Sequence, residues 1–142
     1  MLSTTVAAGD CVYIVTGAGI APALPSGETD GPPGAAALAR ALILALGARP
    51  LLVTETLHAP PVLASADAAS PSGHHIDTLT IDPRQCDRNA LDELLAVDKP
   101  AVVIFVERDG ANGTRAIAVD GIGIDAHAGV VELMRVIAAM AH

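Results

Sequence analysis

Two carboxylates stand immediately before an alanine-rich apolar run in this sequence. Residues 26 to 47 read SGETDGPPGAAALARALILALG, which places Glu28 and Asp30 ahead of a predicted helix. Carboxylates at such a place can serve as general bases or bind a divalent cation. The alternative is that Asp30 only caps the helix while Glu28 is solvated, and the spacing alone leaves both interpretations open.

The start of the same helix offers backbone N–H groups. Pro32 and Pro33 carry no N–H, so we expect the free donors to belong to Gly34, Ala35 and Ala36. Together with the positive end of the helix dipole, these groups would form an anion cradle.

A second polar segment, residues 105 to 113 (FVERDGANG), follows an apolar run. Glu107 is the residue nearest that run, and we expect it to face the same crevice as Glu28 and Asp30. Arg108 could pair with a ligand carboxylate through its bidentate head. An exposed hairpin turn is the alternative, because Asp-Gly and Asn-Gly are ordinary turn dipeptides.

Short β-branched runs alternate with helical patterns along the chain. This alternation predicts one domain over residues 1–142 with an α/β fold, a Rossmann-like three-layer domain with a mostly parallel sheet. The strands at 12–16 and 102–106 should be central, because nearly unbroken apolar runs need cover on both faces. Strands are expected at 11–17, 50–55, 76–81 and 101–107, helices at 33–46, 87–96 and 126–141, and a surface excursion without periodicity at 58–75.

Ligands of open α/β sheets bind beyond the carboxyl ends of the strands, a rule that points to residues 16–34, 54–56, 80–82 and 107–113. Thr16, Gly17 and Glu55 are the candidates at the ends of the first two strands. The TGAGIAP run at 16–22 resembles a dinucleotide fingerprint, but Pro22 stands at the place of the third glycine. A nucleotide-binding enzyme is therefore only a third hypothesis.

Composition excludes several classes of protein. The formal net charge is -8, with 16 acidic and 8 basic residues, so a nucleic-acid backbone would be repelled. The apolar stretch at 35–46 is too short to span a membrane, and no signal-peptide pattern opens the chain. Cys11 and Cys86 lack the spacing of a zinc or redox site, so we expect reduced thiols and a cytoplasmic protein.

The histidines are weaker candidates for a functional site. His74 and His75 lie in a run rich in Ser, Pro and Gly, and we expect them in an exposed loop. His58 follows the second strand and is of slightly greater interest.

The stretch TGAGIAPALPSGETDGPPGAAALARALILALGARPLLVTE resembles the opening of the D-glutamate cyclase-like C-terminal domain family. The core from Glu28 to Ala35 carries the resemblance most specifically, and VIFVERDGANGTRAIAVDGIGIDAH extends it, so that it spans roughly residues 12 to 127. The family's activity, which the resemblance implies here, is the dehydration of D-glutamate to 5-oxo-D-proline. Such a ligand is a small anionic amino acid.

The proposed reaction needs a base, a proton donor and groups that hold the substrate. The expected catalytic residues are Glu28, Asp30 and Glu107. The expected substrate-binding residues are Thr16, Gly17, Thr29, Gly31, Gly34, Ala35, Glu55, Arg108, Gly110 and Asn112. No cofactor is predicted, although a divalent cation held by the three acids is an alternative scheme. A non-catalytic ligand-binding or assembly module, in which the apolar run AGVVELMRVIAAMA supports a homo-oligomer, is the alternative function.

Overall fold

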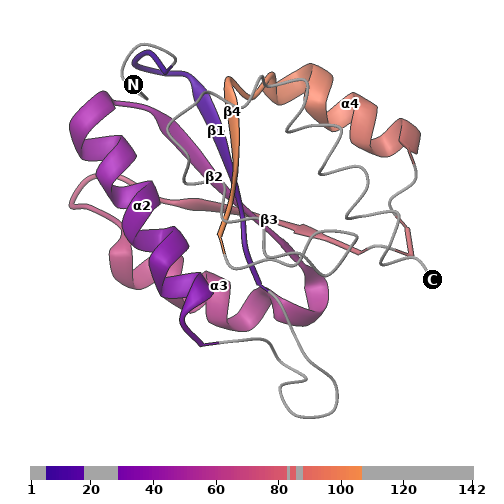
Figure 1. The fold of residues 1–142 in the computed structure, drawn as a ribbon, viewed down its shortest axis with the longest axis horizontal. Helices are drawn as coiled ribbons and strands as arrows, with labels where there is room; N and C mark the ends of the chain where they lie inside the picture. The colour runs from indigo at the N-terminus through magenta and orange to yellow at the C-terminus, as the bar shows by residue number, and fades with distance from the viewer. Residues whose placement is uncertain (1–5, 18–28, 83, 86–87, 107–142) are drawn as a thin grey trace.

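A computed structural model describes residues 6–17, 29–82, 84–85 and 88–106 of the chain. Strands and helices alternate throughout this part of the protein (Figure 1). The elements in order are β1 (Cys11–Val15), α2 (Gly31–Leu46), β2 (Arg49–Glu55), the 3-10 turn η1 (Thr56–His58), α3 (Ala59–Ala69), β3 (Asp77–Ile81), α4 (Arg88–Asp98) and β4 (Val102–Phe105). The helix predicted at 126–141 lies outside the described residues.

All described strands pair in parallel, in the order β3-β2-β1-β4. The chain moves outward from β1 to β2 and β3, and then returns across the sheet to β4 on the other side of β1. Right-handed crossovers that run in opposite directions place their helices on opposite faces. Accordingly, α2 and α3 lie on one side of the sheet and α4 on the other (Figure 1). The predicted α/β fold with a Rossmann-like three-layer arrangement is confirmed.

Each face of β1 contributes to a different hydrophobic cluster. Val12 and Ile14 pack with the buried residues of α2 and α3, while Tyr13 and Val15 pack on the α4 side. Successive strand residues point to opposite faces, so a strand covered on both sides must be apolar throughout. As predicted, β1 is central. β4 is buried and pairs with β1, but it is the last strand of the described sheet, so its predicted central position is not confirmed within the described residues.

Helix α2 follows from a stripe of small and branched apolar residues at helical spacing. Its buried positions include Ala35, Ala36, Ala39, Leu42 and Ile43. Small alanines let the helix lie close to the sheet and to α3. The helix ends as predicted at Gly47, whose φ of 63° is the left-handed conformation that glycine adopts without strain.

The prediction of a surface excursion without periodicity at 58–75 is wrong for most of that range, because α3 occupies Ala59–Ala69. Pro60 and Pro61 stand in the first turn of the helix, where prolines are tolerated, and alanines fill much of the rest. Its buried stripe is short, consisting of Ala59, Val62 and Ala66, and so gives a weak periodic signal. None of the helices in the described ranges is long and apolar enough to cross a membrane.

Helix α4 is tied to the sheet at the end opposite the strand carboxyl ends. The Tyr13 hydroxyl donates a hydrogen bond of 2.7 Å to Asp98 Oδ2, and Arg49 lies 3.5 Å from Asp98 Oδ1. Burial, and then the hydrogen bond to Asp98, raise the pKa of Tyr13 far above its ordinary value. This contact fixes the last turn of α4 against β1 and leaves the opposite edge of the sheet for ligands.

Candidate functional site

The site is built where β1 and β4 end side by side. The chain leaves β1 in one direction and reaches β4 from the other, and such a switch in strand order is where open α/β sheets bind their ligands. The Val106 N–H donates to the Val15 carbonyl at 2.9 Å, which keeps both ends in register. A Cβ added to Gly34 would lie 3.8 Å from Val106 Cγ1, so the first turn of α2 borders the end of β4.

Asp30 occupies the N-cap position of α2, but its carboxylate makes no capping hydrogen bond with the described residues. An N-cap side chain accepts from the N–H of the second or third helical residue. Here those residues are Pro32 and Pro33, which have no N–H. The alternative that the Asp30 side chain only caps the helix is therefore wrong, and the exposed Asp30 carboxylate remains available to a ligand.

The anion cradle expected from the sequence is wrong in one respect. The helix starts at Gly31, two residues before the predicted start, and the Gly34 N–H donates to the Asp30 carbonyl at 3.1 Å. The next amide, that of Ala35, is used in the same way by the regular helical pattern. These two N–H groups are committed to the helix, and the prolines occupy the positions where free donors would normally be.

A group of buried polar residues lies at the adjacent ends of β1 and β2. Thr16 and Thr54 are 0% and 3% exposed, and His58, which ends η1, is 6% exposed. Thr16 Oγ1, Thr54 Oγ1 and His58 Nδ1 have no hydrogen-bond partner among the described residues. Gly17 makes this packing possible. Its φ is +91°, and a Cβ there would lie 2.5 Å from Thr54 Oγ1 and 3.0 Å from His58 Cβ.

Thr54 and His58 were not among the residues predicted for the site. A signal for His58 exists in the sequence, because His58-Ala59-Pro60-Pro61 repeats the pattern of Asp30-Gly31-Pro32-Pro33. Each tetrad begins at the N-cap of a helix and places prolines at its second and third positions. In both helices the N-cap side chain is thereby freed from capping.

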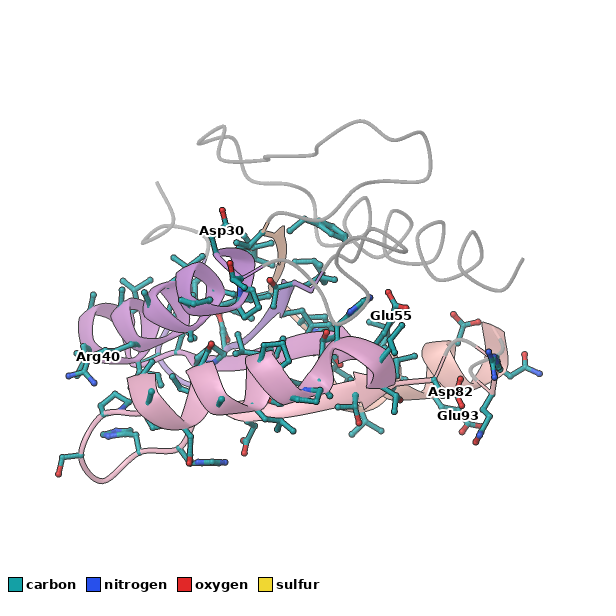
Figure 2. All side chains as sticks on the ribbon, turned by 90° about the horizontal axis from the view of Figure 1, so that it is seen from below. Asp30, Arg40, Glu55, Asp82 and Glu93 are labelled. Carbon is teal, nitrogen blue, oxygen red and sulfur yellow. The ribbon has the colours of Figure 1, made fainter. Side chains whose placement is uncertain are left out.

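The predicted residue Glu55 lies on a different side of the sheet from Thr54. Thr54 follows Leu52 on the face covered by α2 and α3, so the alternation of β2 directs Glu55 toward the α4 face. Figure 2 shows Asp30 at the start of α2 and Glu55 at the end of β2, on separate elements. Glu55 is half-buried, whereas Thr29 is exposed.

The structure thus brings together part of the predicted site: the carboxyl end of β1 and the start of α2. The remaining predictions, Glu28, Glu107, Arg108, Gly110 and Asn112, fall outside the described residues. Within the described ranges, no group of three His, Cys, Asp or Glu side chains is arranged to hold a metal ion.

A pocket of about 460 Å³ lies elsewhere, between α3 and the first part of β3. Three polar residues that line it, Asp67, His75 and Asp77, are exposed. The exposure predicted for His74 and His75 is confirmed. Because this pocket is away from the carboxyl ends of β1 and β4, it does not change the placement of the candidate site.

Comparison with known proteins agrees with the resemblance read from the sequence. No curated relative and no solved structure matches the chain. The model of one family, described as D-glutamate cyclase-like, C-terminal, matches residues 2–113. That range contains every described strand and helix together with the polar groups at the strand ends, and the chain therefore belongs to the D-glutamate cyclase-like, C-terminal family.

Proposed function

We propose that this protein is a lyase that dehydrates D-glutamate to 5-oxo-D-proline, or acts in the same way on a related small amino-acid carboxylate. The observation that carries the proposal is the family match over residues 2–113. The switch point, with a carboxylate that caps no described N–H group and with buried polar groups at the neighbouring strand ends, is suited to a small polar ligand.

The reaction sets simple chemical demands. The amino nitrogen forms a bond to the γ-carboxyl carbon, one carbon–oxygen bond of that carboxyl breaks, and two protons pass from nitrogen to the departing oxygen, which leaves as water. A base must take a proton from the ammonium group, and an acid must deliver a proton to the leaving oxygen. Positive or hydrogen-bonding groups must stabilise the tetrahedral oxyanion.

Asp30 is our choice for the base among the described residues. Its carboxylate is exposed, stands at the start of α2 and is not used in capping. Glu28 is the alternative base. In the same scheme, Glu107 supplies the proton to the departing oxygen and Arg108 pairs with a substrate carboxylate. Glu28, Glu107 and Arg108 lie outside the described residues, and the sequence assigns them these roles.

The test is an assay of purified protein with D-glutamate and with L-glutamate, followed by chiral separation of 5-oxoproline. We expect product from the D enantiomer. Asp30→Asn should abolish at least nine-tenths of turnover, because it removes the charge that a base needs, and should leave the melting temperature nearly unchanged, because no capping bond is lost. Full activity of both Asp30→Asn and Glu28→Gln would contradict the assignment of the base.

A divalent-cation scheme makes a different prediction for the same assay. If the acids bind a metal that polarises the carboxyl, prior treatment with a chelator should stop turnover and added Mg²⁺ or Mn²⁺ should restore it. In the metal-free scheme, which we favour, the chelator has no effect.

A further inference from the structure

Three buried polar atoms gather near the carboxyl ends of β1 and β2. Thr16 Oγ1, Thr54 Oγ1 and His58 Nδ1 are buried and find no hydrogen-bond partner in the described part of the chain. Buried polar atoms of native proteins are nearly always paired, and leaving one unpaired costs about 1–3 kcal/mol. Their gathering in one place indicates a position that receives a bound group.

The three side chains adjoin one another. The Thr16 N–H donates to the Val53 carbonyl at 3.0 Å, which places Thr16 beside Thr54 on the neighbouring strand. Each threonine stands two residues after a strand residue that faces α2 and α3, Ile14 in β1 and Leu52 in β2, so alternation directs both hydroxyls to that face. The contacts that a Cβ at Gly17 would make show that Thr54 and His58 border the same backbone position.

The start of α3 keeps the imidazole available. His58 is the N-cap residue, and its side chain forms no capping bond with described groups. Pro60 and Pro61 stand at the second and third helical positions, so the N–H groups that a cap would use do not exist. The positive end of the α3 dipole adds a preference for an anion.

We propose that Thr16, Thr54 and His58 form a carboxylate subsite that holds the carboxylate of the amino acid that does not react. This inference deepens the proposed function and rests on it for the identity of the ligand. Two hydroxyls and one ring N–H can each donate a hydrogen bond, and a carboxylate accepts about four through its two oxygens. An ammonium group would bring positive charge against the start of a helix, which is unfavourable.

The subsite suits the α-carboxylate better than the γ-carboxyl group that is attacked. Tight binding of the reacting carboxylate in its ground state would stabilise the form that is least electrophilic and would not lower the barrier. The α-carboxylate keeps its charge through the reaction. Holding it at the buried polar side chains anchors substrate and product alike, while the exposed Asp30 carboxylate stays available to the reacting end of the molecule.

The experiment measures binding of two matched probes to the full chain by calorimetry and thermal shift. 5-Oxo-D-proline carries the α-carboxylate, whereas 2-pyrrolidone is the same ring without it. We expect the first probe to bind and to raise the melting temperature by mass action, and the second to do neither. Equal stabilisation by both probes, or no binding of 5-oxo-D-proline by the wild-type chain, would overturn the proposal.

Isosteric variants locate the binding. Thr16→Val and Thr54→Val should each weaken 5-oxo-D-proline binding about tenfold or more, the usual effect of losing a hydrogen bond to a charged group. Neither should lower the melting temperature of the free protein, because an unpaired buried hydroxyl is replaced by a methyl group. Thr78→Val is the matched control. Thr78 Oγ1 is also buried and has no partner within the described ranges, but it lies in β3 beside the other pocket, so binding should not change.

His58 is tested with a pair of substitutions. Asn places an amide near the position of Nδ1, whereas Leu fills the space without a polar group, so His58→Asn should bind 5-oxo-D-proline more tightly than His58→Leu. Wild-type affinity in Thr16→Val and Thr54→Val would mean that the polar atoms hold only a buried water, and the subsite would be refuted.

Two further measurements distinguish an error in the carboxylate subsite from an error in the proposed lyase function. Glutarate, which has no amino group and cannot cyclise, serves as an additional probe. Threonine-dependent binding of glutarate without turnover of D-glutamate would keep the subsite and reject the lyase. Turnover of D-glutamate with an unchanged KM in both threonine variants would keep the lyase and reject the subsite.

Discussion

At the scale of single residues, Gly17 has the most demanding position in the described site. Its φ of +91° is unfavourable for any side chain, and a Cβ would meet Thr54 Oγ1 at 2.5 Å. The residue therefore does two things: it turns the chain at the end of β1, and it leaves room for the side chains that form the carboxylate subsite.

We expect Gly17→Ala to destabilise the protein by about 1–3 kcal/mol through strain and the displaced Thr54 side chain. Urea unfolding at neutral pH measures the effect. Gly73→Ala is a suitable control, because Gly73 also has a positive φ, +79°, but a Cβ there would meet nothing within 4 Å. The control should lose only the part due to backbone strain, and equal losses in both variants would show that the contact with Thr54 is unimportant.

Residue chemistry alone could suggest Asp30 as a site residue from the sequence. It could not show that the carboxylate makes no capping hydrogen bond with the start of α2. The deciding facts are the helix start at Gly31 and the positions of the prolines within the first turn. Likewise, Thr54 is in the sequence only one of several residues at the end of a strand. Its importance appears only when the structure shows that its hydroxyl is buried without a partner in the described region.

At the scale of elements, the two helices that face the site start in the same way. Both α2 and α3 have prolines at their second and third positions, which fixes the backbone at the helix start and removes the N–H groups that would otherwise bind the N-cap side chain. Asp30 and His58 are thus presented by rigid helix starts, and a ligand can use them without first breaking a capping bond.

Restoring the missing N–H groups should reverse this effect. In the double variant Pro32→Ala and Pro33→Ala, Asp30 can accept a capping bond, which contributes about 1 kcal/mol, while the loss of two prolines makes the unfolded chain more flexible. We expect the melting temperature to change little and turnover of D-glutamate to fall several-fold. The matching double variant Pro60→Ala and Pro61→Ala should instead weaken binding of 5-oxo-D-proline. Unchanged turnover and binding in the two variants would show that the prolines serve only to start the helices.

Elements with strong local signals could be predicted from the sequence. The helix ending at Gly47 and the buried strands β1 and β4 carry clear patterns, and the alternation of strands with helices indicated the parallel sheet. Helix α3 was missed because its first turn is marked by prolines, which are common in loops, and its buried stripe has only small residues. The direction of Glu55 was also not predictable, since the face of a strand residue depends on the neighbouring helices.

At the scale of the whole molecule, the two faces of the sheet have different cores. The α2 and α3 side is built from aliphatic residues and alanines, whereas the α4 side contains Tyr13 and Phe105. Tyr13 is 0% exposed and donates to Asp98, so the only tyrosine of the chain joins the core to the last turn of α4. Nearby, burial raises the pKa of the Cys11 thiol above its ordinary value.

These two groups predict a loss of stability in alkali. Burial raises the folded-state pKa values of Tyr13 and Cys11, so the folded protein retains protons that the unfolded chain gives up. Their contribution to the free energy of unfolding is fully present below the ordinary pKa values, which are 9.0 for the thiol and 10.0 for the phenol. The contribution is lost as the pH rises from these values toward the raised pKa values of the folded state. Each group lowers the free energy of unfolding by up to about 1.4 kcal/mol per pH unit above its ordinary value.

Tyr13→Phe separates the contribution of the phenol. At neutral pH the variant should be less stable by about 1.5–3 kcal/mol, because Asp98 loses a charge-assisted hydrogen bond in a largely buried position. Above pH 10 its stability should fall less steeply than that of the wild type, since it has no phenol to ionise on unfolding. Urea unfolding at pH 8, 9, 10 and 11 measures both effects. Parallel pH profiles would mean that Tyr13 ionises as readily in the folded chain as in the unfolded one, which its burial on the α4 side of the sheet and its bond to Asp98 argue against.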